Sequence, residues 1–253
     1  GSGPLGQMRY AERLSGTPLG LVIQAGSYVL FPAFARITGD RVRFRDAMLR
    51  SLGMMCTLSF PLVIMLIPLG VAAAVILFGP VWREAGYATM ILAAGAAAGT
   101  LISFSSEVLK ADGHPQLLIR ITSAELIASG IAMLAMLPLG MLGVTAGASL
   151  GTIATSIYAL ALIRTHNEVS IREFLGQILA PLTAALFMAA VLTPLEFLVV
   201  EADTHETVVG LLLILAQAAF GLVLYAAAMS WFDRQALREV RVLATDAIRR
   251  RTA

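Results

Sequence analysis

The sequence predicts an all-α, polytopic transmembrane helix bundle of about seven spans, and its composition is the first reason. Apolar residues make up 58% of the 253 residues and charged residues only 13%, with a mean hydropathy of +0.83. Soluble domains carry about 25% charged residues. These values exclude an ordinary cytosolic enzyme, a disordered chain and a nucleic-acid-binding domain, so we expect no nucleic acid among its partners.

The second reason is the presence of seven apolar segments. A helix needs about 20 such residues to cross a hydrocarbon core of about 30 Å. Residues 1–231 are therefore expected to form the transmembrane bundle, and residues 232–253 a basic cytoplasmic tail. Residues 71–78 are too few to cross alone, so they extend the second span or lie at the membrane interface. The predicted spans are residues 9–35, 46–70, 84–108, 115–137, 140–163, 174–200 and 207–231.

The distribution of Arg and Lys predicts the orientation, because cytoplasmic loops carry an excess of both. Basic residues follow the first, third and fifth spans and fill the tail. The loop after the second span holds Arg83, the loop after the fourth span holds no charged residue, and the loop after the sixth span holds the acidic residues 201–206. We therefore expect a cytoplasmic C-terminus and an N-terminal end outside. The tail either lies on anionic membrane lipid as an interfacial helix or is a solvated topogenic segment.

Three ionisable residues begin the first span, where each costs about 2.5–3.5 kcal/mol at membrane depth. Arg9 and Arg13 share a helical face at a spacing of four, and Glu12 neighbours both, so the three can pair. Two interpretations stay open. The side chains either reach the interface or form a cationic patch that faces an internal cavity.

A polar stripe follows the third span. Thr100, Ser103 and Glu107 lie on one face of this helix. Lys110 follows Glu107 by three residues and can neutralise it at the cytoplasmic rim. Glu107 is thus either half of a local ion pair or a polar group of a cavity wall.

The fourth span carries the deepest predicted acid. Thr122, Glu125 and Ser129 form one stripe, and Arg120 lies nearer the cytoplasmic end. Five residues separate Arg120 from Glu125, about 140° around the helix, so the two do not pair well. Glu125 is expected to pair with a neighbouring helix or to line a water-filled cavity, because facing lipid unpaired is the costliest alternative.

The fifth span consists of small residues, and the pair Gly147 and Gly151 predicts close helix packing. Glu196 lies near the outer end of the sixth span, where we expect it at the interface.

Motifs for other chemistry are missing from the sequence. There is no phosphate-binding loop of the G-x-x-x-x-G-K-[ST] type and no H-E-x-x-H. His114, His166 and His205 fall in predicted loops far apart in sequence, and Cys56 is the single cysteine. We therefore expect no metal, no cofactor and no catalytic residue.

Four motifs stand out in the first 165 residues. They are Leu5-Gly6 with Ala11, Arg13 and Leu14, followed by VLFPAFAR (29–36) and Asp40-Arg41-x-Arg43; FGPVW with Ala85 (78–85); LxAxGxP (109–115); and GxxGVxA (140–146). Together, in this order and spacing, they resemble the polysaccharide flippases, of the O-antigen and colanic-acid type, in the multidrug/oligosaccharidyl-lipid/polysaccharide exporter superfamily. The chain departs from that family at Gln7 and Met8, where aromatics are frequent, and at Lys110, Asp112 and His114.

The resemblance implies that the chain is the second, C-terminal lobe of a two-lobe exporter fold, whose missing N-terminal lobe would be its main partner. It implies a transporter rather than an enzyme. The expected substrate is an undecaprenyl-diphosphate-linked oligosaccharide, moved across the bacterial inner membrane by alternating access for polysaccharide biosynthesis. Arg9, Arg13 and Arg120 are then candidates to bind the anionic head group, and Glu107 and Glu125 to couple ions or gate the cavity.

Other functions are considered beside this one. A drug/cation antiporter of the same superfamily would use a deep acid in a less basic cavity. A glycan polymerase or ligase would carry a large periplasmic loop with Arg or His, and the short outer loops count against it. A seven-span structural or receptor-like protein fits the length, but no motif supports it.

Overall fold

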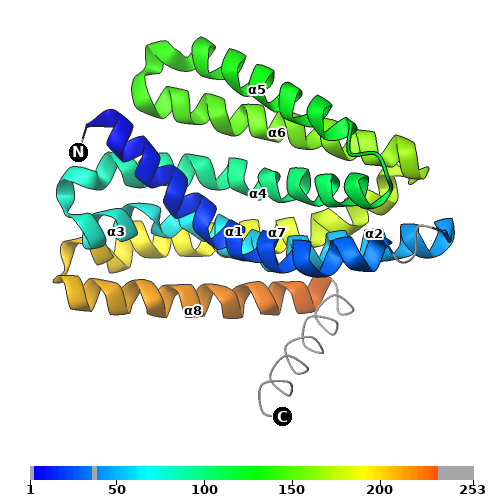
Figure 1. Ribbon diagram of the computed structural model, residues 1–253. Helices are drawn as coiled ribbons and strands as arrows, with labels where there is room; N and C mark the ends of the chain where they lie inside the picture. Colours follow the sequence, from blue (N-terminus) through cyan, green and yellow to red (C-terminus); the bar gives the residue numbers. More distant parts are fainter. Residues whose placement is uncertain (1–2, 36–38, 233–253) are drawn as a thin grey trace.

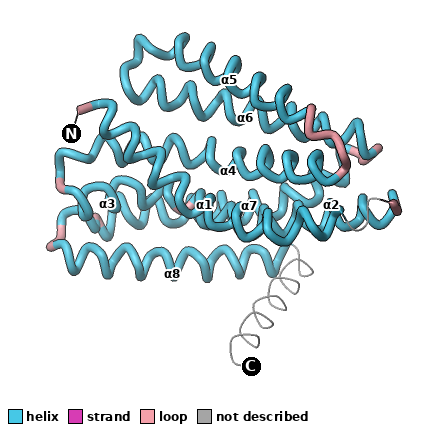
Figure 2. The backbone as a smooth tube through the Cα atoms, viewed as in Figure 1, coloured by secondary structure: helices cyan, strands magenta, loops and turns pink. Residues whose placement is uncertain are grey.

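The structure, a computed structural model, describes residues 3–35 and 39–232, and within these residues it contains helices and loops but no strand (Figure 2). This confirms the predicted all-α bundle. Short 3-10 turns cover Pro80–Trp82, Leu137–Leu139 and Ala202–Thr204, and a π-helical turn covers Glu196–Val200. The α-helices are α1 (Pro4–Ala35), α2 (Arg41–Ile64), α3 (Leu66–Phe78), α4 (Arg83–Ala111), α5 (Leu117–Met136), α6 (Gly140–Asn167), α7 (Ile171–Leu195) and α8 (Thr207–Phe232).

The described helices traverse the bundle in alternating directions. Helices α1, α4, α6 and α8 run one way, and α2 with α3, α5 and α7 run the other way (Figure 1). The connections therefore gather at two ends. We call the end with residues 79–82, 137–139 and 201–206 the acidic end. The opposite end holds the connections at residues 39–40, 112–116 and 168–170. We call it the basic end because Arg and Lys residues flank these connections: Arg41, Arg43, Lys110, Arg164 and Arg172.

The second passage is broken into two helices. Asp40 caps α2, because its side chain accepts a hydrogen bond from the backbone N–H of Arg43 at 3.1 Å. The helix stops at Ile64, where Pro68 can neither donate to the carbonyl four residues earlier nor fit its ring beside it. Residues 71–78 thus belong to a separate helix, α3, rather than to an unbroken extension of the second span.

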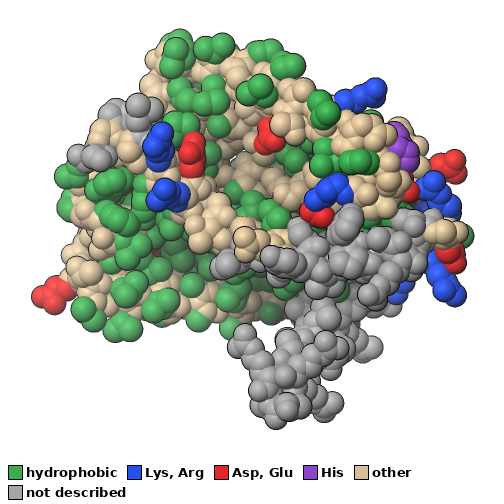
Figure 3. All heavy atoms as spheres, in the orientation of Figure 1, with side chains coloured by type: hydrophobic (Ala, Val, Ile, Leu, Met, Phe, Trp, Pro, Cys, Tyr) green, Lys and Arg blue, Asp and Glu red, His purple; other side chains and the backbone are tan. Residues whose placement is uncertain are grey.

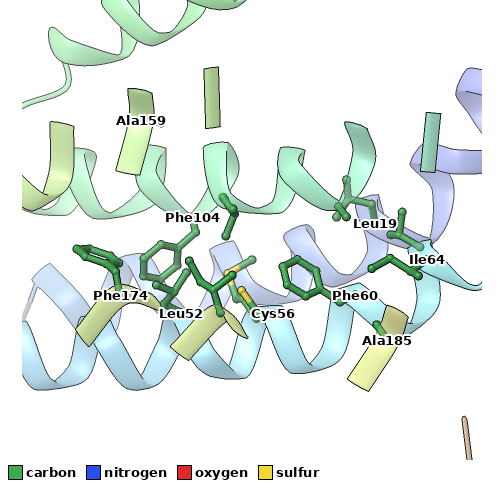
Figure 4. Close-up of a cluster of buried hydrophobic side chains, with 14 of the residues drawn as sticks. Leu19, Leu52, Cys56, Phe60, Ile64, Phe104, Ala159, Phe174 and Ala185 are labelled. Carbon is green, nitrogen blue, oxygen red and sulfur yellow. The ribbon is translucent and has the colours of Figure 1, made fainter. Parts of the chain in front are cut away.

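Helix α2 buries a stripe of large side chains at a spacing of four, together with most residues of its second half. Its core packs against α4 and α7, with Phe104 and Phe174 next to it (Figure 4). The stripe consists of Phe44, Met48, Leu52, Cys56 and Phe60, each at most 2% exposed. Because the residues repeat every fourth position, they face one side of a helix.

The outer helices expose apolar side chains instead. In α5, only Leu117 and Ile121 are buried, while Leu126 and Leu134 are more than 70% exposed. Exposure of this kind fits a lipid environment, where apolar side chains need no further cover. Five described stretches are long and apolar enough to cross a membrane: Arg41–Ile64, Pro80–Ala111, Leu117–Asn167 (both α5 and α6), Ile171–Thr204 and Thr207–Trp231. The chain is a multi-pass membrane protein.

The motif glycines occupy turns. Gly79, Gly113 and Gly140 have φ angles of +94°, +80° and +71°, a region that a side chain disfavours. At Gly113 the turn ends α4 with a bond from the N–H of His114 to the carbonyl of Leu109 at 2.9 Å, a Schellman pattern. Each of the last three motifs therefore marks a reversal or break between helices.

Small residues bring α5 and α6 together. A Cβ at Gly147 would lie 2.6 Å from backbone atoms of Ala132 and Met133, and one at Gly151 would clash with Ser129. The predicted close packing at this glycine pair is confirmed. On the other side of α6, the Ser149 hydroxyl donates to the carbonyl of Ile91 in α4 at 2.9 Å.

Candidate functional site

One face of the bundle is hollowed over α4, between α1 and α5 (Figure 3). Helix α1 packs against α4, α4 against α6, and α6 against α5, so α1 and α5 stand on the two sides of the α4–α6 pair. Basic and acidic side chains lie over both rims of the hollow (Figure 3). This hollow is the candidate site, because ionisable groups are otherwise rare in the spans.

Helix α1, on one side of the hollow, carries the three charged residues that the sequence places at the start of the first span. Arg9, Glu12 and Arg13 are all exposed, and no ion pair joins them. The two guanidinium groups are thus available to a ligand, as either sequence interpretation allows. The Thr17 hydroxyl donates to the backbone carbonyl of Arg13 at 2.6 Å.

Helix α5, on the other side of the hollow, carries Arg120 and Glu125. Arg120 is exposed, and Glu125 is half-buried without an ion pair to any described residue. Ser129, at the end of the same stripe, sits against Gly151 in the α5–α6 contact. The stripe therefore runs from the open surface into the helix interface, with Glu125 at the boundary.

Glu107 on α4 forms the local ion pair that its spacing predicted. The Lys110 ammonium lies 2.6 Å from Glu107 Oε1, and the Glu107 side chain is 12% exposed. Thr100 on the same stripe is fully buried, and its hydroxyl has no hydrogen-bond partner among the described residues. Thr100 and Glu107 are therefore too buried for this stripe to line an open cavity. Any gating role of Glu107 stays a prediction.

A charged cluster joins three elements at the basic end. Arg41 at the start of α2 lies 3.0 Å from Asp112, and His114 Nδ1 lies 3.4 Å from the same carboxylate. The ring of His114 contacts that of His166, with centroids 5.1 Å apart. His166 falls in the last turn of α6 rather than in a loop. The described residues contain no group of metal-ligating side chains.

Aromatic rings gather where α1 meets the acidic end. Tyr10 contacts Phe78 and Trp82, with ring centroids 4.5 and 5.4 Å apart. The Gln7 amide donates to the carbonyl of Val81 at 3.1 Å. These contacts fix the start of α1, and with it Arg9 and Arg13, to the turn between α3 and α4.

A cavity of about 240 Å³ opens at the acidic end, beside the connection between α7 and α8. Arg83 and Asp203 form an ion pair in its lining, 2.5 Å apart. Its lining consists of Val71, Ala72, Arg83, Glu196, Phe197, Glu201, Asp203 and Thr204.

Glu196 follows the end of α7, near the outer end of the predicted sixth span, but no pattern in the sequence indicated that it is buried inside the bundle. Its side chain is 3% exposed. It is covered because α8 returns along α7 and brings Gln217 against the carboxyl group. No local sequence pattern gives this contact, since the two residues are separated by 21 positions.

These observations define a multi-pass helical membrane protein with a charged hollow on one face. Residues 1–86 match a family described as polysaccharide biosynthesis protein. Among solved structures, the chain is similar to "Lipid II flippase MurJ, inward closed conformation", with a TM-score of 0.72 and 20% sequence identity. That match covers 92% of this chain and 48% of the other. No curated protein matches by sequence.

At 20% identity, the structural likeness shows a shared fold. The chain spans about half the length of the solved flippase. Both comparisons support the resemblance drawn from the sequence motifs, one for the first 86 residues and the other for nearly the whole chain.

Proposed function

We propose that this chain is the second lobe of a flippase that moves undecaprenyl-diphosphate-linked oligosaccharide across the bacterial inner membrane by alternating access. The observation that carries the proposal is the charged hollow between α1 and α5 (Figure 3). The fold shared with a lipid II flippase and the match of residues 1–86 to a polysaccharide biosynthesis family point to the same substrate class.

Three Arg side chains suit an anionic head group. Arg9 and Arg13 on α1 and Arg120 on α5 are exposed and free of ion pairs among the described residues. Guanidinium groups bind phosphate oxygens through charge-assisted, often bidentate hydrogen bonds. In this proposal they hold the diphosphate from the two rims. The sugars occupy the polar hollow, and the prenyl chain stays in lipid beside the apolar face of α5.

Two acids are proposed to couple ions or gate the site. Glu125 is half-buried and has no ion pair among the described residues, so an ion or a charged substrate that enters the hollow would change its protonation or its pairing. Glu107 is held by Lys110, so it responds only when that pair opens. Glu125 is therefore the stronger candidate.

The positions of the basic residues support a cytoplasmic basic end, with the acidic end facing the periplasm. Alternating access would then require the missing N-terminal lobe to close against the hollow from the other side.

A drug/cation antiporter of the same superfamily is the second candidate, and it is favoured because Glu125 forms no ion pair with any residue that the structure describes. It would use that acid for an organic cation and would have no need of the Arg residues on the rims.

The test replaces Arg side chains of α1 and α5 by neutral ones in the protein that the natural reading frame encodes. Arg13→Gln and Arg120→Gln each delete a charge-assisted contact, so we expect diphosphate-lipid affinity to fall about ten- to a hundredfold. Glycan export should fall with it. Arg43→Gln is the control, because Arg43 is exposed at the basic end and pairs with Asp40. Intact export in both rim variants contradicts the cationic site.

A further inference from the structure

Glu196 is a buried carboxyl group whose hydrogen-bond partners are neutral. Its Oε1 accepts a bond from the backbone N–H of Ala202 at 3.1 Å. Its Oε2 lies 2.6 Å from the side-chain amide of Gln217 on α8. No ion pair of Glu196 is present within the described residues, although its side chain is 3% exposed. A buried charge without a counter-charge is costly, and the group escapes this cost by taking up a proton.

The charges around the cavity also favour the neutral form. Arg83 comes from the start of α4, but it is engaged by Asp203 at 2.5 Å. Glu201, from the connection between α7 and α8, adds a second negative charge to the lining. Helix α3 contributes only Val71 and Ala72, and α8 contributes the neutral Gln217. Like charge and low polarity both oppose ionisation of Glu196.

The bond from α8 brings no counter-charge to the carboxyl group. The side-chain amide of Gln217 donates from Nε2 to Glu196 Oε2 at 2.6 Å, and a neutral amide cannot balance the charge of a buried carboxylate. Gln217 is 5% exposed, and its other amide atom has no partner among the described residues. The amide is thus held by Glu196 alone.

We propose that Glu196 is a proton-binding site that is neutral in the packed structure and opens to water through the cavity at the acidic end. On ionisation the O–H bond breaks, the electron pair stays on the carboxylate, and a cavity water carries the proton away. The charged group then draws water between the end of α7 and α8. The inference does not depend on the substrate, since it concerns the α7–α8 connection and not the hollow.

Infrared difference spectroscopy tests the protonation state of the protein in lipid vesicles. The wild type should show the C=O stretch of a protonated carboxylic acid at neutral pH, shifted in heavy water. Glu196→Gln should remove this band, and Glu206→Gln, an exposed acid of the same connection, should keep it. The proposal is overturned if Glu196→Gln leaves the band in place, or if the wild type has none. If Glu196→Gln does not fold, a wild type without the band still overturns the proposal.

Thermal unfolding across a pH series gives an independent readout. Because folding holds the proton on Glu196, raising the pH should lower the melting temperature of the wild type relative to Glu196→Gln. The Glu206→Gln curve should stay parallel to that of the wild type. Parallel curves for the wild type and Glu196→Gln mean that Glu196 does not bind a proton on folding, and they contradict the proposal.

Discussion

At the scale of single residues, Gly147 determines how closely the backbones of α5 and α6 approach each other. Gly147 brings α6 against the peptide between Ala132 and Met133 of α5, and no side chain fits in that space. Gly130 lies on the same α5 helix with nothing within 4 Å of the place where a Cβ would be. A methyl group added at Gly147 would therefore meet the backbone of α5, whereas one added at Gly130 would meet nothing.

We predict that Gly147→Ala destabilises the protein by about 1–3 kcal/mol, because the added methyl group forces α5 and α6 apart. Thermal unfolding in detergent micelles measures the effect. Gly130→Ala is the matched control and should be neutral or slightly stabilising, since Ala is about 0.5–1 kcal/mol better than Gly inside a helix. Equal melting temperatures for the two variants would refute the close contact.

The Tyr225 hydroxyl joins α8 to the centre of the bundle, where it donates to the carbonyl of Thr57 at 3.0 Å. Tyr225→Phe should cost about 1 kcal/mol, the net worth of a typical hydrogen bond. Tyr158→Phe serves as the control, since Tyr158 is 39% exposed. A wild-type melting temperature for Tyr225→Phe would show that the bond contributes nothing.

At the scale of elements, α7 begins with a reciprocal cap. The Ser170 hydroxyl accepts from the N–H of Glu173 at 3.3 Å, and the Glu173 carboxylate accepts from the N–H of Ser170 at 3.0 Å. The same Glu173 pairs with Arg45 of α2 at 2.5 Å. One short segment thus starts α7 and fixes it to α2.

Ser170→Ala removes the cap and should lower stability by about 0.5–2 kcal/mol. Ser170→Thr keeps a hydroxyl that can cap and should retain most of that stability. Chemical unfolding in mixed micelles compares the two. Equal losses in both variants would indicate that the hydroxyl bond is not the source.

Several of these elements could be predicted from the sequence, and others could not. Local spacing was sufficient for the Glu107–Lys110 pair, because both residues lie within one turn of α4. The spacing of Gly147 and Gly151 indicated that α6 packs closely on a neighbour, but not that the neighbour is α5. The break at Met65 lies between Pro61 and Pro68, a signal that the sequence contains. The burial of Glu196 depends on the return of α8, so periodicity gives no sign of it. The hollow likewise depends on how α1 and α5 pack on either side of α4 and α6.

At the scale of the whole molecule, the described helices place the basic and acidic ends on opposite sides of the bundle. We predict that cysteines introduced as Gln116→Cys and Glu206→Cys react from opposite sides of the membrane. Both positions are exposed, and the native Cys56 is 0% exposed and therefore silent. A membrane-impermeant maleimide added to intact spheroplasts should label only Glu206→Cys. Labelling of Gln116→Cys under those conditions would reverse the proposed orientation.

The most direct test of the central claim deletes the reading frame and follows the lipid-linked glycan. If the chain belongs to a flippase for such a glycan, the deletion strain loses its surface polysaccharide, accumulates the lipid-linked precursor on the cytoplasmic leaflet, and keeps its drug resistance. The intact reading frame restores export, and one carrying Arg13→Gln with Arg120→Gln does not. Normal surface polysaccharide together with new sensitivity to cationic drugs would contradict the claim and favour the antiporter.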